Sequence, residues 1–228
     1  MDGLGECMTM SLRCFTAYDV RGRIPEDFDA QIALRIALAF ARRCRVNKMA
    51  IGRDMRLTSP EIAKTIIAGL LDQGIDVVDI GLCGTEEVYH AVFSGEAAGI
   101  EGGIMITASH NPAEYNGMKI VERGARPVSC DSGLEDVARM AVDQGWLREL
   151  RAQPPARRGV CTEVADKQAY VAHLLATVDC SVMRPLKLVV NAGNGCAGPI
   201  VDLLAPHLPF TFIRSEEHTS ELQSHLNL

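Results

Sequence analysis

Three features that mark particular classes of protein are missing from this 228-residue sequence. The first is an excess of positive charge, since 23 Lys and Arg stand against 29 Asp and Glu, for a net charge of −6. The basic clusters at residues 42–45 and 157–158 are short and far apart, so the broad positive patch that nucleic-acid binding requires is absent from the sequence. We therefore expect no nucleic-acid partner.

Paired cysteines and long apolar runs are the other two missing features. The eight cysteines include no C-x-x-C pair and no His/Cys group at zinc spacing, which argues against a structural metal site. No apolar run approaches the ~18 residues that suggest a membrane span, and no basic-then-apolar leader opens the chain. We expect a reduced, cytoplasmic protein with no membrane partner, and the sequence does not indicate its oligomeric state.

What the sequence does contain is a regular alternation of strand-like and helix-like stretches. Ile32, Ile36 and Phe40 follow helical spacing, and the motif TSPE at 58–61 matches a capping box with Pro in the first helical turn. Such alternation predicts an α/β layer sandwich. The expected helices are 31–43, 58–71, 85–93, 132–144 and 167–178, and the expected strands are 49–52, 75–80, 103–107, 118–121, 186–190 and 210–213.

A proline-rich segment divides this pattern into two parts. Residues 151–159, RAQPPARRG, have no apolar anchor and predict a linker between a first domain at 1–150 and an incomplete second domain at 160–213. Residues 214–224, RSEEHTSELQS, equal one translation frame of a common sequencing-library adapter without a mismatch. We therefore expect residues 214–228 to be an artefactual tail; the alternative is a solvated acidic tail.

A turn at residues 106–121, ITASHNPAEYNGMKIV, carries the most chemistry-bearing side chains. A protease-type nucleophile needs a base and an orienting acid or a G-x-S-x-G elbow, and this turn is not such an elbow. A structural turn in which Ser109 and Asn111 satisfy backbone groups is a second interpretation. The third is phosphoryl chemistry, because an exposed hydroxyl with Lys119 and Arg21 available can hold a phosphate.

A glycine turn near the second predicted domain has two interpretations. Gly193, Gly195 and Gly198 spell G-x-G-x-x-G between an expected strand and an expected helix, which is the dinucleotide fingerprint. That fingerprint alone is weak, and Pro199 suits the first turn of any helix after a tight junction. We predict a structural turn.

Four motifs in order resemble those of the α-D-phosphohexomutases. They are YDVRG at 18–22, GRDMRLTSPE at 52–61, TASHNP followed by EYNGMKIV at 107–121, and NAGNGCAG at 191–198. GTEEVYHAVF at 84–93 and ERGARPVSCDSGL at 122–134 are similar to the bacterial phosphomannomutase branch, which serves GDP-mannose biosynthesis. The resemblance covers about residues 12–213. It implies a three-layer α/β/α sandwich with a mixed sheet, followed by a truncated second α/β domain.

The resemblance implies an intramolecular phosphotransferase of the isomerase class. Ser109 would carry a phosphate, donate it to a sugar monophosphate to give a 1,6-bisphosphate, and then take back the other phosphate. The net reaction would interconvert mannose 6-phosphate and mannose 1-phosphate through nucleophilic catalysis by a hydroxyl. The implied substrate is a phosphosugar, and the implied cofactors are Mg²⁺ and a hexose 1,6-bisphosphate.

The resemblance also implies roles for individual residues. Lys119 matches the family's general acid/base, whose pKa must fall from ~10.4 through burial or a neighbouring cation. Arg21 matches the arginine that neutralises charge on the phosphoryl group, and its alternative role is an ion pair with Asp19 or Asp54. Further residues of the same motifs are expected to line the site: Tyr18, His110 and Asn111.

The sequence departs from the family at the metal. Members hold Mg²⁺ with the phosphoserine and three aspartates of a D-x-D-x-D-R-like loop, and no such loop occurs here. Ser109, through its phosphate, would be the one ligand present and would hold Mg²⁺ poorly. We therefore expect an inactive fragment of an active parent. A phosphoglucomutase or bifunctional phosphohexomutase is an alternative parent, while YDVRG argues against the glucosamine branch, which usually has an FGTDG-like motif.

Overall fold

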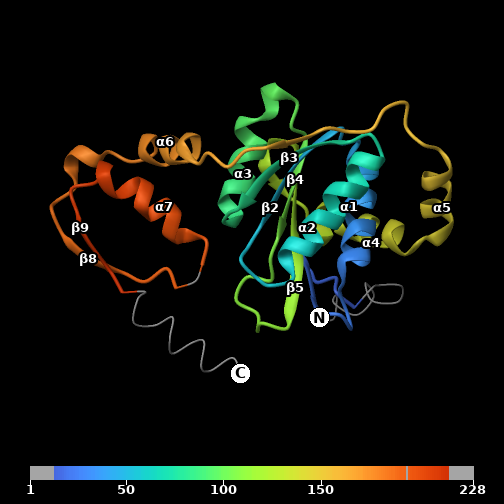
Figure 1. Cartoon of the computed structure of the whole chain (residues 1–228), viewed down its shortest axis with the longest axis horizontal. Helices are drawn as coiled ribbons and strands as arrows, with labels where there is room; N and C mark the ends of the chain where they lie inside the picture. The colour runs from blue at the N-terminus through green and yellow to red at the C-terminus, as the bar shows by residue number, and fades with distance from the viewer. Residues whose placement is uncertain (1–12, 194, 216–228) are drawn as a thin grey trace. The chain divides into compact units, whose positions relative to one another are not determined.

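The structure is a computed structural model that describes residues 13–193 and 195–215 (Figure 1). The chain divides into two compact units, Met1–Val164 and Ala165–Leu228. The sequence placed the start of the second domain at residue 160, whereas the division lies after Val164. The reason is that Cys161–Glu163 pairs as a strand with the sheet of the first unit.

A mixed β-sheet forms the middle layer of the first unit. The strands found among its described residues are β1 (Val20–Arg23), β2 (Lys48–Arg53), β3 (Asp76–Leu82), β4 (Gly102–Ile106), β5 (Tyr115–Glu122), β6 (Arg126–Pro127) and β7 (Cys161–Glu163). They follow the order β1-β5-β4-β2-β3-β7, with β6 paired to β5. Strands β4, β2, β3 and β7 run parallel, while β5 lies antiparallel between β1 and β4.

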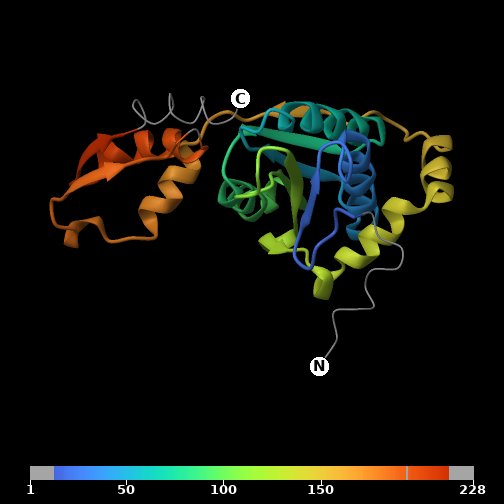
Figure 2. The same cartoon turned by 90° about the horizontal axis from the view of Figure 1, so that it is seen from below.

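Helices cover both faces of this sheet (Figures 1 and 2). One face packs against α1 and α2, and the other against α3. The predicted three-layer α/β/α sandwich with a mixed sheet is thereby confirmed. The helices of the first unit are α1 (Ala30–Cys44), α2 (Ser59–Asp72), α3 (Thr85–Ser94), α4 (Leu134–Val142) and α5 (Gln144–Ala152), with short 3₁₀ turns at Glu96–Ala98, Arg123–Ala125 and Cys130–Ser132.

Strand β5 shows how the two faces are divided. Successive side chains on a strand point to opposite faces. Met118 and Ile120 accordingly enter the core with Phe40 of α1, and Val121 enters the core with Val88 of α3. The hydrophobic pattern of this strand therefore determines which of its residues remain available for a site on the α3 side.

The start of α2 differs from the sequence prediction. Thr58 precedes the helix with helical dihedral angles and makes no side-chain cap. Its hydroxyl instead accepts a hydrogen bond from Nδ2 of Asn116 at 2.8 Å. The predicted capping box is wrong because a buried amide in β5 binds the hydroxyl that the cap would use.

The segment expected to be a linker is fastened to the first unit. The predicted helix 132–144 is split into α4 and α5 at Asp143, whose carboxylate caps α5 by accepting from the backbone N–H of Gly145 at 2.8 Å. Helix α5 continues to Ala152, inside the predicted linker. Beyond it, Arg157 forms an ion pair with Asp76 at 2.8 Å.

The described part of the second unit is a small α/β structure. Its elements are α6 (Gln168–Ala176), β8 (Lys187–Val190), α7 (Ala197–Leu204) and β9 (Thr211–Arg214), with 3₁₀ turns at Cys180–Val182 and Ala205–His207. β8 and β9 pair in parallel. Arg214, predicted as the first residue of the tail, is the last residue of β9. The rest of that prediction, from residue 216 onward, lies outside the described residues.

The glycine turn of this unit joins β8 to α7. Gly193 has a φ of +54°, which favours glycine, and its N–H donates to Oδ1 of Asn191 at 2.8 Å. These local contacts are those of a tight strand-to-helix junction. No helix formed by the described residues combines the length and apolar character needed to cross a membrane.

Candidate active site

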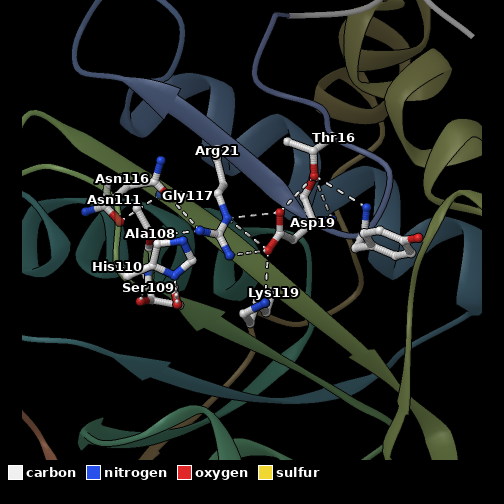
Figure 3. A network of polar contacts seen from close by, with 12 residues as sticks. Thr16, Asp19, Arg21, Ala108, Ser109, His110, Asn111, Asn116, Gly117 and Lys119 are labelled. Carbon is white, nitrogen blue, oxygen red and sulfur yellow. Dashed lines mark hydrogen bonds and ion pairs between the residues drawn. The ribbon is translucent and has the colours of Figure 1, made fainter. Parts of the chain in front are cut away.

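Two neighbouring strands present polar side chains on one face of the sheet. Residues two apart on a strand share a face. Arg21 of β1 therefore lies on the same face as Asp19, which directly precedes the strand, and Lys119 of β5 lies on the same face as Gly117. The strands pair antiparallel with Arg21 opposite Gly117. The sheet register therefore brings these charged residues together at the position shown in Figure 3.

Gly117 permits the close approach of these two strands. A Cβ atom added to Gly117 would lie 1.9 Å from the carbonyl oxygen of Val20, which is far inside van der Waals contact. Any side chain here would separate β1 from β5 and with them Arg21 from Lys119. The glycine in the motif EYNGMKIV therefore has a packing reason at the site itself.

Arg21 links β1 to the serine loop, residues 107–114 between β4 and β5. Its Nη1 donates to the carbonyl oxygen of Ala108 at 3.1 Å and to Oδ1 of Asn111. Its Nη2 lies 2.8 Å from Oδ2 of Asp19. Arg21 therefore forms the ion pair with Asp19 that was its alternative role. The same guanidinium also donates hydrogen bonds to the serine loop.

Asp19 is a buried carboxylate at the centre of the network. Its oxygens accept hydrogen bonds from Arg21, from Lys119 at 2.9 Å and from the hydroxyl of Thr16 at 2.9 Å. Burial alone would raise the pKa of Asp19, but the hydrogen bonds from Arg21, Lys119 and Thr16 together lower it below its ordinary value. Asp19 is therefore the charged anchor of the site, a role that the sequence did not assign to it.

Lys119 lies beside this carboxylate with 29% of its side chain exposed. Its ammonium donates to Asp19, and no hydrogen bond between Lys119 and Ser109 occurs in the part of the chain that the structure describes. Lys119 is partly buried, and Arg21 contacts the same oxygen of Asp19.

Ser109 occupies an unusual backbone conformation at the turn of the serine loop. Its φ is +54°, which costs ~1–2 kcal/mol for a residue other than glycine. Its N–H donates to Oγ1 of Thr107 at 2.9 Å, and its side chain is exposed. Backbone strain of this kind is concentrated at functional sites. The serine hydroxyl thus lies at the surface on a turn whose left-handed conformation depends on contacts made by the rest of the loop.

His110 and Tyr18 lie at the edge of the site in different ways. The Nδ1 atom of His110 is 3.3 Å from Oγ of Ser109, so the two neighbouring side chains do face each other. His110 was expected to line the site, and it lies directly beside the serine. Tyr18 exposes 76% of its surface, and its backbone N–H donates to Thr16.

Two further residues of the site were missed by sequence reasoning. Arg56 donates hydrogen bonds to backbone carbonyls of the serine loop, including that of Ser109 at 3.0 Å. Asn116 is fully buried and donates to the hydroxyl of Ser59 at 2.9 Å, which ties β5 to the start of α2. Both residues belong to motifs that carried the family resemblance. Their contacts, with backbone carbonyls for Arg56 and with a hydroxyl for Asn116, follow no periodicity in the sequence that would predict them.

The described residues do not by themselves fit a divalent metal. Across residues 13–193 and 195–215 no cluster of three or more His, Cys, Asp or Glu side chains could hold one. Asp19, the carboxylate nearest to the network's centre, is already engaged by Arg21 and Lys119. A phosphate on Ser109 would offer one ligand group, which is too few for a hard cation such as Mg²⁺.

Fold and site together define an α/β/α domain that presents a serine hydroxyl beside paired cations. Residues 12–139 match the model of the "Phosphoglucomutase/phosphomannomutase, alpha/beta/alpha domain I" family, and the chain belongs to this family. The predicted membership of the phosphohexomutase superfamily is thereby confirmed.

Individual relatives agree with this assignment. The chain is 50% identical over 206 residues to "Phosphohexose mutases" of Xanthomonas campestris and 45% identical over 212 residues to "Phosphomannomutase" of Salmonella montevideo. In both comparisons 90% of this chain is covered, and it spans 44% of the relative's length. The crystal structure of a Burkholderia thailandensis family member superposes with a TM-score of 0.75 at 33% identity, covering 90% of this chain and 44% of that one.

Proposed function

We propose that this chain is the serine-bearing part of a phosphomannomutase, an enzyme that interconverts mannose 6-phosphate and mannose 1-phosphate. Ser109 carries the phosphoryl group and exchanges it with the sugar through a 1,6-bisphosphate intermediate. The names of the Salmonella and Escherichia relatives support the mannose assignment.

The observation that carries this proposal is the placement of Ser109. An exposed hydroxyl sits on a strained turn, and Arg21 holds that turn from behind through Ala108 and Asn111. Arg21 and Lys119 together carry two positive charges against one negative charge on Asp19. A phosphate dianion on Ser109 would therefore meet net positive charge, which is what phosphoryl transfer requires.

Proton transfer is the role we assign to Lys119. When the phosphoryl group leaves Ser109, its bond to the serine oxygen breaks while a bond to a sugar hydroxyl oxygen forms. The proton of that hydroxyl must pass to a base, while the departing serine oxygen must gain a proton. Lys119 faces the phosphate as an ammonium, then leaves Asp19 and gives its own proton to solvent, from which the serine oxygen is protonated. As a neutral amine it takes the proton of the sugar hydroxyl. Arg21 then remains as the cation that balances Asp19.

A bifunctional phosphohexomutase acting on glucose and mannose phosphates is the second candidate. The Xanthomonas relative, at 50% identity, bears the broader name "Phosphohexose mutases". Assays with both glucose 1-phosphate and mannose 1-phosphate distinguish the two candidates. A glucose rate similar to the mannose rate would favour the bifunctional enzyme.

Mg²⁺ and a hexose 1,6-bisphosphate complete the proposed reaction, and Mg²⁺ would supply positive charge to the phosphoryl group. The described residues supply no metal cluster, and the chain spans 44% of its relatives' length. We therefore expect turnover from a polypeptide of the relatives' length that contains this segment, and none from the 228-residue chain alone. Turnover by the chain alone would contradict the second expectation.

The test is phosphorylation of Ser109 in the longer polypeptide. The protein is incubated with glucose 1,6-bisphosphate and Mg²⁺, and fragment ions in mass spectrometry locate the phosphate. We expect phosphate on Ser109 and its loss in Ser109→Ala, while Ser94→Ala at the end of α3 retains it. A phosphopeptide that persists unchanged in Ser109→Ala would refute the proposal.

A further inference from the structure

A single guanidinium binds the backbone of the serine loop along its length. Nη2 of Arg56 donates to the carbonyl oxygens of Ser109 at 3.0 Å and Asn111 at 2.6 Å. Nη1 donates to the carbonyl oxygens of Pro112 at 2.7 Å and Tyr115 at 2.9 Å. One side chain from the β2–α2 connection therefore contacts both the phosphate-carrying residue and the first residue of β5.

The guanidinium is itself held in place. Its Nε lies 3.3 Å from Oδ2 of Asp54, and the two side chains are 14% and 15% exposed. Asp54 also accepts from the hydroxyl of Ser59 at 2.6 Å, and its backbone N–H donates to the carbonyl oxygen of Ile106 at 2.9 Å. The two terminal nitrogens of the arginine thus donate four hydrogen bonds to carbonyl oxygens, three of them in the serine loop and one at the first residue of β5, while Nε faces the carboxylate of Asp54.

These contacts control the conformation of Ser109. The N–H of Ser109 is bound by Thr107 and its C=O by Arg56, so both peptide groups that flank its Cα are fixed. With a φ of +54° the residue is strained, and it returns to an ordinary conformation unless both groups are held. The direction in which its hydroxyl points therefore depends on Arg56.

We propose that Arg56 is a positioning residue for phosphoryl transfer, which acts through the loop carbonyls to aim the hydroxyl of Ser109. This inference rests on the proposed role of Ser109 as phosphate carrier. The guanidinium of Arg56 is 14% exposed and engaged by carbonyl oxygens and Asp54, so its loss should lower kcat and leave KM nearly unchanged. Lysine cannot replace it, because one ammonium with three donors cannot reach four carbonyl oxygens and a carboxylate.

The decisive experiment compares Arg56→Ala, Arg56→Lys and the control Arg139→Ala in the polypeptide of the relatives' length. Arg139 is an exposed arginine on α4 with one ion pair, to Asp136. We expect kcat to fall about 10- to 100-fold in both Arg56 variants with KM within about threefold, since small misplacement of a reacting group has effects of this size. Guanidinium ion added to Arg56→Ala should restore part of the rate, and Arg139→Ala should match the wild type.

A second measurement separates this proposal from the proposed function. Hydrogen exchange of residues 107–117 in the 228-residue chain reports whether the serine loop loosens. We expect faster exchange there in both Arg56 variants and an unchanged rate in α1. If the wild type is never phosphorylated on Ser109, the proposed function fails while loop exchange still tests Arg56. Unchanged loop exchange, or wild-type kcat in Arg56→Ala with Ser109 phosphorylated, overturns the positioning role.

Discussion

The ammonium of Lys119 lies 2.9 Å from Oδ2 of Asp19, although 100 residues separate the two in the chain. Arg21 contacts the same oxygen at 2.8 Å. One buried carboxylate therefore balances two cations and keeps them at a fixed distance from the serine loop. Two positive charges face one negative charge here, so the group of three side chains retains a net positive charge.

Replacing Asp19 by Asn tests this balance. The substitution preserves shape and leaves two partly buried cations without their carboxylate, so we expect the free energy of unfolding at pH 7 to fall by about 3 kcal/mol. The pKa of Asp19 is lowered in the folded protein. Its stabilising effect is therefore complete above the unfolded-state value of ~3.9 and disappears as pH falls through the lower folded value.

Urea denaturation at several pH values gives this measurement. Asp72→Asn is the matched control, because Asp72 forms an ion pair with Arg158 at 2.8 Å and both side chains are more than half exposed. Surface pairs of this kind contribute about 0–1 kcal/mol. An unfolding free energy of Asp19→Asn equal to that of the wild type at pH 7 would contradict the assigned role.

Asp76 provides a second pH-dependent contact, at the segment that precedes β7. Hydrogen bonds from Arg157 and from the backbone N–H of Val160 lower the pKa of Asp76 to about 2. In a carboxyl-carbon NMR titration we expect a midpoint near 2 for the wild type. In Arg157→Ala the midpoint should move up toward the ordinary ~3.9, because the first of these donors is gone.

As at Asp19, the lowered pKa of Asp76 means that the free energy of unfolding falls as the pH falls. A lowered folded pKa means that the stabilisation by Asp76 is present above ~pH 4 and is lost between about pH 4 and 2. The difference in unfolding midpoint between wild type and Asp76→Asn should therefore shrink over that interval. A difference that persists unchanged at pH 2 would show that the contact with Arg157 does not depend on the charge of Asp76.

The strained turn at Ser109 predicts that two substitutions which both remove the hydroxyl differ in their effect on stability. Ser109→Gly and Ser109→Ala both remove the hydroxyl, but only glycine accepts a φ of +54° without cost. The left-handed penalty of ~1–2 kcal/mol exceeds the ~0.5–1 kcal/mol that glycine loses through its freer unfolded chain. Ser109→Gly should therefore be more stable than Ser109→Ala by about 0.5–1 kcal/mol.

Thermal unfolding of the pair measures this difference. Ala68→Gly in α2 supplies the opposite case, since it changes an exposed position within a helix and should cost about 1 kcal/mol. Equal stability of the two Ser109 variants would mean that the turn relaxes once the hydroxyl is removed. Neither variant should form a phosphoenzyme.

Local patterns predicted much of the architecture. The spacing of Ile32, Ile36 and Phe40 predicted α1, whose buried face includes Ile36 and Phe40. The alternation of elements predicted the layers. The division after Val164 differs from the predicted start of the second domain at residue 160, because the short strand Cys161–Glu163 has no pattern of its own and forms by pairing with β3.

The candidate site was predicted in part for a related reason. Arg21 and Asn111, which belong to motifs recognisable in the sequence, are in contact, and Asn111 lies in the same loop as Ser109. The roles of Asp19 and Arg56 depend on which strands are neighbours and on carbonyl oxygens that every residue possesses. These contacts depend on the tertiary structure and leave no local sequence pattern. The same holds at Thr58, where the predicted capping box does not form.

The antiparallel pairing of β1 with β5 has a consequence for folding fidelity. A slip of β1 by one residue would turn Asp19 and Arg21 toward the apolar layer beneath α1 and α2, where Met118 and Ile120 now lie, and would leave Lys119 on the opposite face without its carboxylate. Moving an ion pair into an apolar layer costs several kcal/mol per ion, which is comparable with the whole stability margin of a small domain. A chain with this register would therefore unfold rather than persist in a folded form that lacks the site.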